Sequence, residues 1–182
     1  MAVSNIGIAN GQTALINGGN QAGTILTNTT DSYTLTAHVG DNIVLRLGTV
    51  KFDGNLRLYG PEGALLKSVA SGTDAELAFT ATNNGTFTAL VSSYFSGGAG
   101  TYVLHLAQFP EAFSVPAGDE GGAMANGGNA AGSNTLGDLD MWTTTAHAGD
   151  NIVLRLGTAG FDGILRLYGP DGALLKSVAS GP

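Results

Sequence analysis

The chain contains no cysteine, few aromatic residues and few charged residues. Of its 182 residues, 7% are aromatic and 12% are charged. Without cysteine the fold has no disulfide bond and no thiolate metal site. Lysine and arginine total only 7 against 14 acidic residues, which gives a formal net charge of −7. Binding of nucleic acid needs a basic surface, so this charge balance argues against a nucleic-acid partner.

Long apolar runs are also missing. No stretch approaches the roughly 18 apolar residues that a membrane-spanning helix requires, so we expect no membrane span. Residues Met1–Asn5 have neither a basic nor an apolar region, and they are not a signal peptide. A cytosolic protein and an exported protein whose signal was removed or lies elsewhere both fit, and the absence of cysteine fits either one.

Glycine is abundant instead. The chain has 29 glycines, more than twice the usual share of about 7%. They follow no Gly-X-Y period, which excludes collagen. With 43% hydrophobic residues and so few charges, the chain is not a disordered acidic tail. It is predicted to fold.

An internal repeat organises the chain. Thr36–Gly72 and Thr145–Gly181 are identical at 32 of 37 positions, at an offset of 109 residues. The match extends upstream more weakly, where Tyr33 aligns with Trp142. A unit of this length is the size of a domain, so the sequence predicts a tandem array of small modules.

The second unit is incomplete. Copy one continues past Gly72 with Thr73–Gln108, whereas the sequence ends at Pro182, one residue beyond the match to Gly72. We predict a complete module over residues 1–108 (copy one). Residues 109–125 (the junction segment) are predicted to be a linker or a lead strand that includes Phe113 and Val115. Residues 126–182 form a partial second module (copy two).

Two explanations of the incomplete copy stay open. One is simple truncation. The other is completion by a neighbouring chain, because exposed strand edges are templates for strand addition. Residues 6–16 of that chain are one candidate donor, although they offer one strand where three are missing. Self-association of this kind would build a filament if the contact did not close.

Copy one has the pattern of short strands separated by turns. Alternating apolar residues put Ile43, Leu45 and Leu47 on one face, and Leu56 and Leu58 on another inward face. About eight strands are expected, at 24–27, 31–37, 42–47, 55–59, 64–69, 75–80, 86–92 and 101–108. Strands at this spacing with glycine-rich turns predict an all-β fold of tandem, jelly-roll-like antiparallel β-sandwich modules, the second one incomplete.

The motifs of both copies resemble a known family. In copy two these are Gly137–Trp142, Thr145–Arg155 and Leu165–Leu175, and in copy one Asn84–Thr88 and Gly98–Leu104 match closing strands. They are similar to the bacterial pre-peptidase C-terminal domain family. The resemblance implies a jelly-roll-like sandwich, export, and a non-catalytic role beside peptidases or in surface proteins, with calcium or a fibrous substrate bound by some relatives.

Acidic residues are the candidate metal ligands. Asp138 and Asp140 offer two carboxylates from one loop, and Asp119 and Glu120 lie upstream in a glycine-rich loop with free carbonyls. Ca²⁺ prefers such oxygen ligands. The alternative is that these carboxylates are solvated or cap turns. Copy one keeps only Asp31, since it has Asn28–Asp31 where copy two has Gly137–Asp140.

Other candidates have more ordinary interpretations. Tyr59, Tyr94 and Tyr102 could form a binding surface for an extracellular polymer, and Trp142 could join them or pack in the core. His38, His105 and His147 belong to no catalytic or metal motif, and His105 is expected to face outward. Asp41 and Asp53 are expected in turns, where they could pair with Arg46 and Arg57 on neighbouring strands.

The sequence therefore predicts a non-enzyme without a required cofactor. We expect a structural or binding module of a larger extracellular or cell-surface bacterial protein. Two alternatives remain: a calcium-dependent adhesion or substrate-binding module, and a filament subunit assembled by strand complementation.

Overall fold

The computed structural model describes residues 12–179. Its regular elements are strands, and the described residues include no helix that could cross a membrane. The strands run in chain order as β1 (Thr13–Ala14), β2 (Asn20–Ile25), β3 (Thr30–Ala37), β4 (Asn42–Val50), β5 (Gly54–Tyr59), β6 (Leu65–Ser71), β7 (Asp74–Thr80), β8 (Gly85–Ser93), β9 (Gly100–Phe109), β10 (Gly121–Ala123), β11 (Met141–Thr143), β12 (Ile164–Tyr168) and β13 (Leu174–Ala179).

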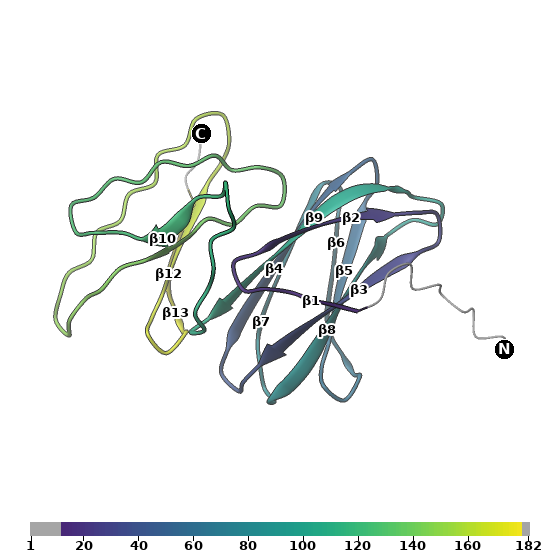
Figure 1. Cartoon of the computed structure of the whole chain (residues 1–182), viewed down its shortest axis with the longest axis horizontal. Coiled ribbons are helices and arrows are strands. Elements are labelled where there is room, and N and C mark those ends of the chain that lie inside the picture. The colour runs from purple at the N-terminus through teal and green to yellow at the C-terminus, as the bar shows by residue number, and fades with distance from the viewer. Residues whose placement is uncertain (1–11, 180–182) are drawn as a thin grey trace.

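Copy one folds as a β-sandwich of two sheets (Figure 1). The first sheet has the order β1-β3-β8-β5-β6, and the second has the order β2-β9-β4-β7. β2 pairs with β9, β3 with β8, β4 with β7 and β5 with β6, all antiparallel. These nested pairs are those of one long hairpin rolled up on itself, which is the jelly roll. The predicted all-β sandwich is confirmed.

The core lies between the two sheets, as the alternation of the strands predicts. Ile43, Leu45 and Leu47 of β4 are fully buried, and so are Leu56 and Leu58 of β5. The intervening Val44 faces the other way and belongs to a second apolar cluster outside the sandwich. One face of each strand is therefore committed to the core, and the outer face of β4 is free for a different contact.

Copy two keeps part of this architecture. The parallel pair β10–β11 repeats the pair β1–β3, because Ala14 pairs with Thr34 and Ala123 pairs with Thr143, each 109 positions later. The hairpin β12–β13 repeats β5–β6 in the same register. In copy one, β8 lies between β3 and β5. Among residues 12–179 no strand lies between β11 and β12, and the two pairs of copy two are separate sheets.

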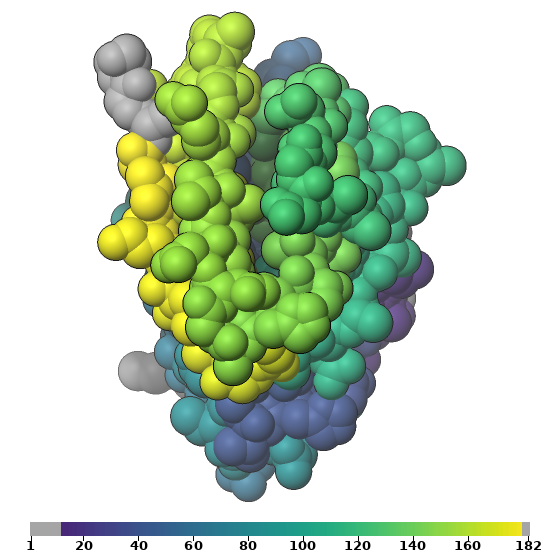
Figure 2. Space-filling view, turned by 90° about the vertical axis from the view of Figure 1, so that its left-hand side faces the viewer, coloured from purple at the N-terminus to yellow at the C-terminus, as the bar shows by residue number. Residues whose placement is uncertain are grey.

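Copy two packs on the outer face of the four-stranded sheet (Figures 1 and 2). Val44, Ala107 and Met141 form a buried cluster there, extended by Phe109, Phe113, Leu139 and Tyr168. The rings of Phe109 and Tyr168 stack with centroids 3.9 Å apart. Phe113 therefore packs in this cluster and does not lie in a strand with Val115. The lead strand provided by the junction segment is β10.

Candidate functional site

A polar cavity lies where the junction segment meets copy one. It has a volume of about 290 Å³, and its polar lining comes from Asn20, Asp119, Glu120, Ser133, Thr135 and Asp138. Asn20 begins β2 of copy one, whereas the others lie before β10 or in the loop between β10 and β11. The cavity is thus built by both copies and the junction segment together.

Three carboxylates converge beside this cavity. Asp119, Glu120 and Asp140 each offer an oxygen atom, and these atoms lie within 4.8 Å of one another. Glu120 directly precedes β10 and Asp140 directly precedes β11. Because β10 and β11 are parallel, the residues before them lie at the same end of the pair. Asp119 ends a turn in which its N–H donates to the carbonyl of Pro116.

Asp140 has the most perturbed carboxyl group of the three. Burial, followed by the charges of Asp138, Glu120 and Asp119, raises its pKa to about 6. Its Oδ1 atom is buried and accepts no hydrogen bond from the described residues. Burying a carboxylate oxygen without a donor destabilises the fold. A bound proton, a cation or a donor from outside the described residues would stabilise this atom.

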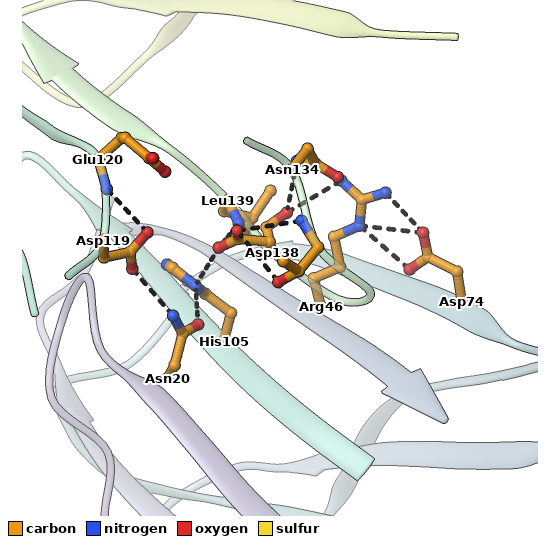
Figure 3. Close-up of polar contacts among 10 residues, drawn as sticks. Asn20, Arg46, Asp74, His105, Asp119, Glu120, Asn134, Asp138 and Leu139 are labelled. Carbon is orange, nitrogen blue, oxygen red and sulfur yellow. Dashed lines mark hydrogen bonds and ion pairs between the residues drawn. The ribbon is translucent and has the colours of Figure 1, made fainter. Parts of the chain in front are cut away.

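Asp138 has a different role from Asp140. It is 4% exposed, and its Oδ1 accepts from the N–H of Leu139 at 2.9 Å while its Oδ2 caps Thr135. Its turn lies against β4, where Arg46 donates to the Asp138 carbonyl (Figure 3). Gly137 and Gly48 meet there, so closely that a Cβ on Gly137 would lie 2.5 Å from the Gly48 nitrogen. Asp138 caps this turn and also lines the cavity.

A chain of hydrogen bonds links the core sheet to the carboxylates. His105 Nδ1 lies 2.6 Å from Asn20 Oδ1, and Asn20 Nδ2 donates to Asp119 Oδ2 at 2.9 Å (Figure 3). The Asn20 side-chain nitrogen donates to Asp119, so the Asn20 side-chain oxygen must accept a hydrogen bond from His105. The proton of the neutral imidazole therefore lies on Nδ1. His105 Nε2 is buried without a partner among the described residues.

His105 was expected to face outward, and that expectation was incomplete. The side chain does leave the sandwich on the outer face of β9, between the inward Leu104 and Leu106. It is nevertheless only 1% exposed, because Asp138 and the junction segment cover it. Burial lowers the pKa of His105 and outweighs the opposing charges of Asp138 and Asp119.

The predicted pairs between arginine and turn aspartate are wrong. Arg46 binds Asp74 of β7 with its Nε and Nη2 atoms, at 2.5 Å for the shortest contact. Asp41 instead holds its own turn, as expected, by accepting from the His38 N–H at 2.9 Å. It also accepts from the side-chain amide of Gln108. The pairing partner of Arg46 is set by the register of β4 with β7.

The structure moves two predicted site residues into the core of copy one. Asp31 is fully buried and accepts from the Tyr102 hydroxyl at 2.6 Å. Tyr102 is 3% exposed, and its hydroxyl also lies 2.5 Å from that of Tyr33. Burial and these bonds raise the pKa of Tyr102. Tyr102 therefore offers no binding surface, and Asp31 is not grouped with Asp119, Glu120 and Asp140.

The other two tyrosines lie apart in the structure. Tyr94 is 58% exposed and packs its edge against Phe95, which is 60% exposed, with ring centroids 4.9 Å apart. Tyr59 is half-buried at the end of β5. Trp142 lies in β11 at 37% exposure. The expected tyrosine surface is reduced to Tyr94, with Phe95 as a neighbour that the sequence did not suggest.

A second group of ligand-type residues joins two distant segments. His38 Nδ1 lies 3.3 Å from Glu111 Oε1, and Asp41 completes the group. His38 is 67% exposed there. Glu111 was not among the residues predicted from sequence, and neither was Asn20. Each acts across more than 70 residues of chain, and no local motif marks such a contact.

Comparisons with known proteins give structural likenesses only. No protein-family model matches the chain, and no curated protein matches it. The pre-peptidase C-terminal domain of a Bacillus anthracis collagenase is similar in structure, at 20% identity and a TM-score of 0.48, over 55% of this chain and 98% of that domain.

Two periplasmic inhibitors of g-type lysozyme are also similar. PliG from Aeromonas hydrophila is 12% identical, with a TM-score of 0.42, over 52% of this chain and 96% of its own. PliG from Salmonella Typhimurium is 17% identical, with the same TM-score, over 55% of this chain and 99% of its own. The fold assigned above rests on the strand pairing of the chain itself.

Proposed function

We propose that the chain is a non-catalytic structural or binding unit of an extracellular or cell-surface bacterial protein. The proposal rests on where the three histidines lie and on which side chains they contact. His105 is buried against Asn20, while His38 and His147 are exposed beside the aspartates of their own turns. Within residues 12–179 no histidine is hydrogen-bonded to a serine hydroxyl, as a nucleophilic triad would require.

The family assignment belongs to this proposal. The jelly-roll pairing of copy one and the repeated motifs at Gly137–Trp142 and Leu165–Leu175 support membership in the pre-peptidase C-terminal domain family. Membership would imply export and a place beside a catalytic or adhesive domain. It would also fit division of the chain into residues 1–108, the junction segment 109–125 and residues 126–182.

An activity screen tests the non-catalytic assignment. We expect the purified chain to show no hydrolysis of peptide, ester or glycoside substrates. Turnover that survives purification and is abolished by His105→Gln or Asp138→Asn would contradict the assignment. Retention of turnover in both variants would show that neither side chain is responsible for it, and turnover that separates from the chain on a further column would show a contaminating enzyme.

We also propose that the junction carboxylates bind Ca²⁺ and thereby fix the position of copy two on copy one. Ca²⁺ is held by six to eight oxygens, many from carboxylates and loop carbonyls. Asp119, Glu120 and Asp140 would supply the charged oxygens, and the Asp138 carboxylate and the hydroxyls of Ser133 and Thr135 lie at the same cavity. The raised pKa of Asp140 supports this proposal, because a bound cation would offset the burial and the neighbouring negative charges that raise it.

Such an ion would couple the two copies mechanically. Asp119 is tied through Asn20 to His105 in the four-stranded sheet of copy one, whereas Asp140 directly precedes β11 of copy two. One cation bound to both would therefore close a connection from one copy to the other. An adhesive or polymer-binding role would use exposed rings such as Tyr94 and Phe95.

Calorimetry and thermal unfolding with added CaCl₂ test the calcium proposal. A site that binds only the folded chain raises its stability by about 2.7 kcal/mol at a hundredfold excess over Kd. Glu120→Gln should abolish both the heat and the rise in Tm. Asp162→Asn, which removes the same charge at an exposed position of copy two, should retain them. Absence of heat, or equal loss in both variants, would remove this site.

A further inference from the structure

One end of copy one carries exposed apolar side chains. They lie on or beside three loops, which connect β2 to β3, β4 to β5 and β8 to β9. Leu26 is 60% exposed, Val50 47%, Tyr94 58% and Phe95 60%. Together with the exposed Lys51, these four residues are called the loop end below. The loop end points away from copy two (Figure 1).

The pairing of the strands makes the three loops neighbours. Each loop connects one sheet of the sandwich to the other. β9 pairs with β2 on one side and with β4 on the other, and β8 pairs in the same way with β3 and β5. The loop from β8 to β9, which carries Tyr94 and Phe95, is therefore the middle one of the three. The loop end is one continuous region of the surface.

Hydrogen bonds hold these loops in place. The Tyr94 N–H donates to the carbonyl of Asp53 at 2.8 Å, which fastens the middle loop to the loop between β4 and β5. The Ser93 hydroxyl donates to the carbonyl of Phe95 at 2.8 Å. Phe52, next to Asp53, is buried in the core. The exposed rings stand on an ordered loop, so their binding requires little further ordering of the chain.

Lys51 has a backbone conformation that glycine favours. Its φ is 71°, and Gly160, at the same repeat position, has a φ of 87°. A residue with a side chain is destabilised in this left-handed region, and such residues cluster at functional sites. Copy two forms the same turn with glycine. The lysine side chain is therefore present at a cost in stability, which indicates a role in binding and not in folding.

The two copies differ at this loop. The repeated segments are identical at 32 of 37 positions, and two of the differing positions are the adjacent residues Val50 and Lys51. Copy two has Ala159 and Gly160 in their place. Copy two thus lacks both the larger apolar side chain and the basic one. This part of the loop end is a feature of copy one alone.

We infer that the loop end binds the surface of a phospholipid bilayer. Leu26, Val50, Tyr94 and Phe95 would insert below the headgroups, and Lys51 would bind a lipid phosphate. Burial of apolar side chains at the acyl boundary and attraction of lysine to phosphate both stabilise such binding. Tyrosine suits this depth because its ring is apolar and its hydroxyl is polar. The inference goes beyond the proposed function and does not involve the junction carboxylates.

The distribution of charge suits a surface of phosphates. The chain has 14 acidic residues against 7 basic ones, but residues 26–29, 51–53 and 94–99 include only Lys51 and Asp53. Lys51 is exposed, whereas Asp53 is partly buried. The net negative charge of the chain therefore lies outside these loops. A phosphate surface would repel the rest of the molecule and would favour approach by the loop end.

The arrangement of the side chains favours a bilayer over a polymer. The rings of Tyr94 and Phe95 meet edge to face at 80°, so they form no flat platform for a sugar ring or a fibre. Leu26 and Val50 stand on separate loops at either side. A bilayer adapts to separate protruding side chains, whereas a rigid partner would need a matching hollow for each one.

Flotation of the full chain with lipid vesicles tests the inference. The probes are vesicles of phosphatidylcholine alone and of phosphatidylcholine mixed with phosphatidylglycerol, both in EDTA so that calcium makes no contribution. We expect the chain to float with both and more strongly with the anionic vesicles. A chain with Trp142→Phe and Phe95→Trp should shift its emission to shorter wavelength and be quenched by brominated acyl chains. Failure to float with either vesicle overturns the inference.

Two valines provide a matched pair of variants. Val39 is 61% exposed and lies between β3 and β4, at the opposite end of copy one from Val50. Val50→Ser should lower the partition coefficient, whereas Val39→Ser should leave it unchanged. Tyr94→Ser combined with Phe95→Ser should lower it by about tenfold or more, the effect of burying an aromatic side chain. Equal losses in the two valine variants would show unspecific adsorption and overturn the inference.

Lys51→Gly separates binding from folding. Glycine adopts a positive φ without strain, so this variant should have a higher Tm. It should nevertheless bind the anionic vesicles about fivefold more weakly. Unchanged binding would overturn the assignment of Lys51 to a lipid phosphate. If the chain instead bound a fibrous protein or polysaccharide through Tyr94 and Phe95 and bound no vesicle, the loop end would be a polymer site and the inference would be wrong.

Discussion

The same seven residues have two different structures in this molecule. Asn42–Gly48 lies in β4, hydrogen-bonded to β7 on one side and to β9 on the other. Asn151–Gly157 repeats it residue for residue but forms no strand, and Val153 is 83% exposed where Val44 is 3% exposed. Because the local sequence is identical, the difference comes from the neighbours: β-propensity expresses packing in a sheet more than a preference of the backbone.

The strands without a counterpart in copy two are interior strands, and this explains why neither sheet of copy two is continuous. In copy one β8 and β9 are interior strands, each with two partners, whereas β1, β2, β6 and β7 lie at edges. The described residues of copy two include no counterparts of β8 and β9, and both of its sheets are divided at the centre. The pairs that survive, β10–β11 and β12–β13, are those whose two strands both precede the missing segment.

The largest expected effect comes from completing copy two in the same chain. Joining the sequence of Thr73–Phe109 directly after Gly181 should convert residues 151–159 into a strand and bury Trp142. Amide hydrogen exchange should then slow across 151–159 to rates near those of β4. A control extension carrying the equivalent of Phe87→Asp should leave these amides fast. Fast exchange in both chains would show that the missing strands are not what keeps residues 151–159 out of a sheet.

Truncating the same repeat position in each copy should give unequal losses. Leu58 is fully buried, so Leu58→Ala should lower the free energy of unfolding by about 2–5 kcal/mol. Leu167 lines an open groove, so Leu167→Ala should cost less than about 1 kcal/mol. Urea unfolding followed by circular dichroism measures both. Equal losses would mean that copy two is already closed in solution.

The thermal stability of the chain should depend on pH in the direction set by Asp140. Its pKa is raised to about 6 in the fold, above the unfolded value of about 3.9. Its contribution to stability is therefore complete below the unfolded value and is lost as the pH rises through about 6. Tm measured from pH 4 to 7 should show this loss, and Asp140→Asn should remove it. An unchanged profile in the variant would assign the dependence to another group.

The smallest expected effect is at the ion pair between the copies. Arg166 and Glu76 are each partly exposed, at 22% and 28%, and such pairs contribute about 0–1 kcal/mol. Arg166→Ala should thus leave the unfolding of copy one unchanged within error while modestly speeding amide exchange in β12. Arg155→Ala, in the repeat segment that forms no strand, is the matched control and should change neither.

Most of the copy-one fold follows from local pattern. Alternation along β4 and β5 identifies the buried leucines, and the turn residues separate the strands correctly. The predicted strand limits are wrong where pairing with a distant strand sets them. The strand expected at 24–27 is β2, Asn20–Ile25, because the pairing of β2 with β9 extends as far as Asn20 and His105. Such a contact across 85 residues has no local signal.

The candidate site was predictable only in part. Asp119, Glu120 and Asp140 are a local acidic pattern, and the structure brings them together. Asp31 shares a repeat position with Asp140, yet Tyr102 reaches Asp31 from β9 and makes it a core residue. A repeat predicts equal roles only where both copies have the same neighbours, and in this chain they do not.

The side chain of Asn17 would determine how a pulling force passes along the chain. Asn17 donates to the carbonyls of Gln108, Glu111 and Ala112, and its own carbonyl accepts from the N–H of Ser114. The segment that enters the sandwich is thereby fastened to the segment that leaves it. A force applied at the two ends of copy one would meet the pair β1–β3 first, because β1 precedes Asn17. It would then be carried across Asn17 before it reached β5 or β8. In an array of such modules, the contacts of Asn17 would keep most of each sandwich out of the line of pull.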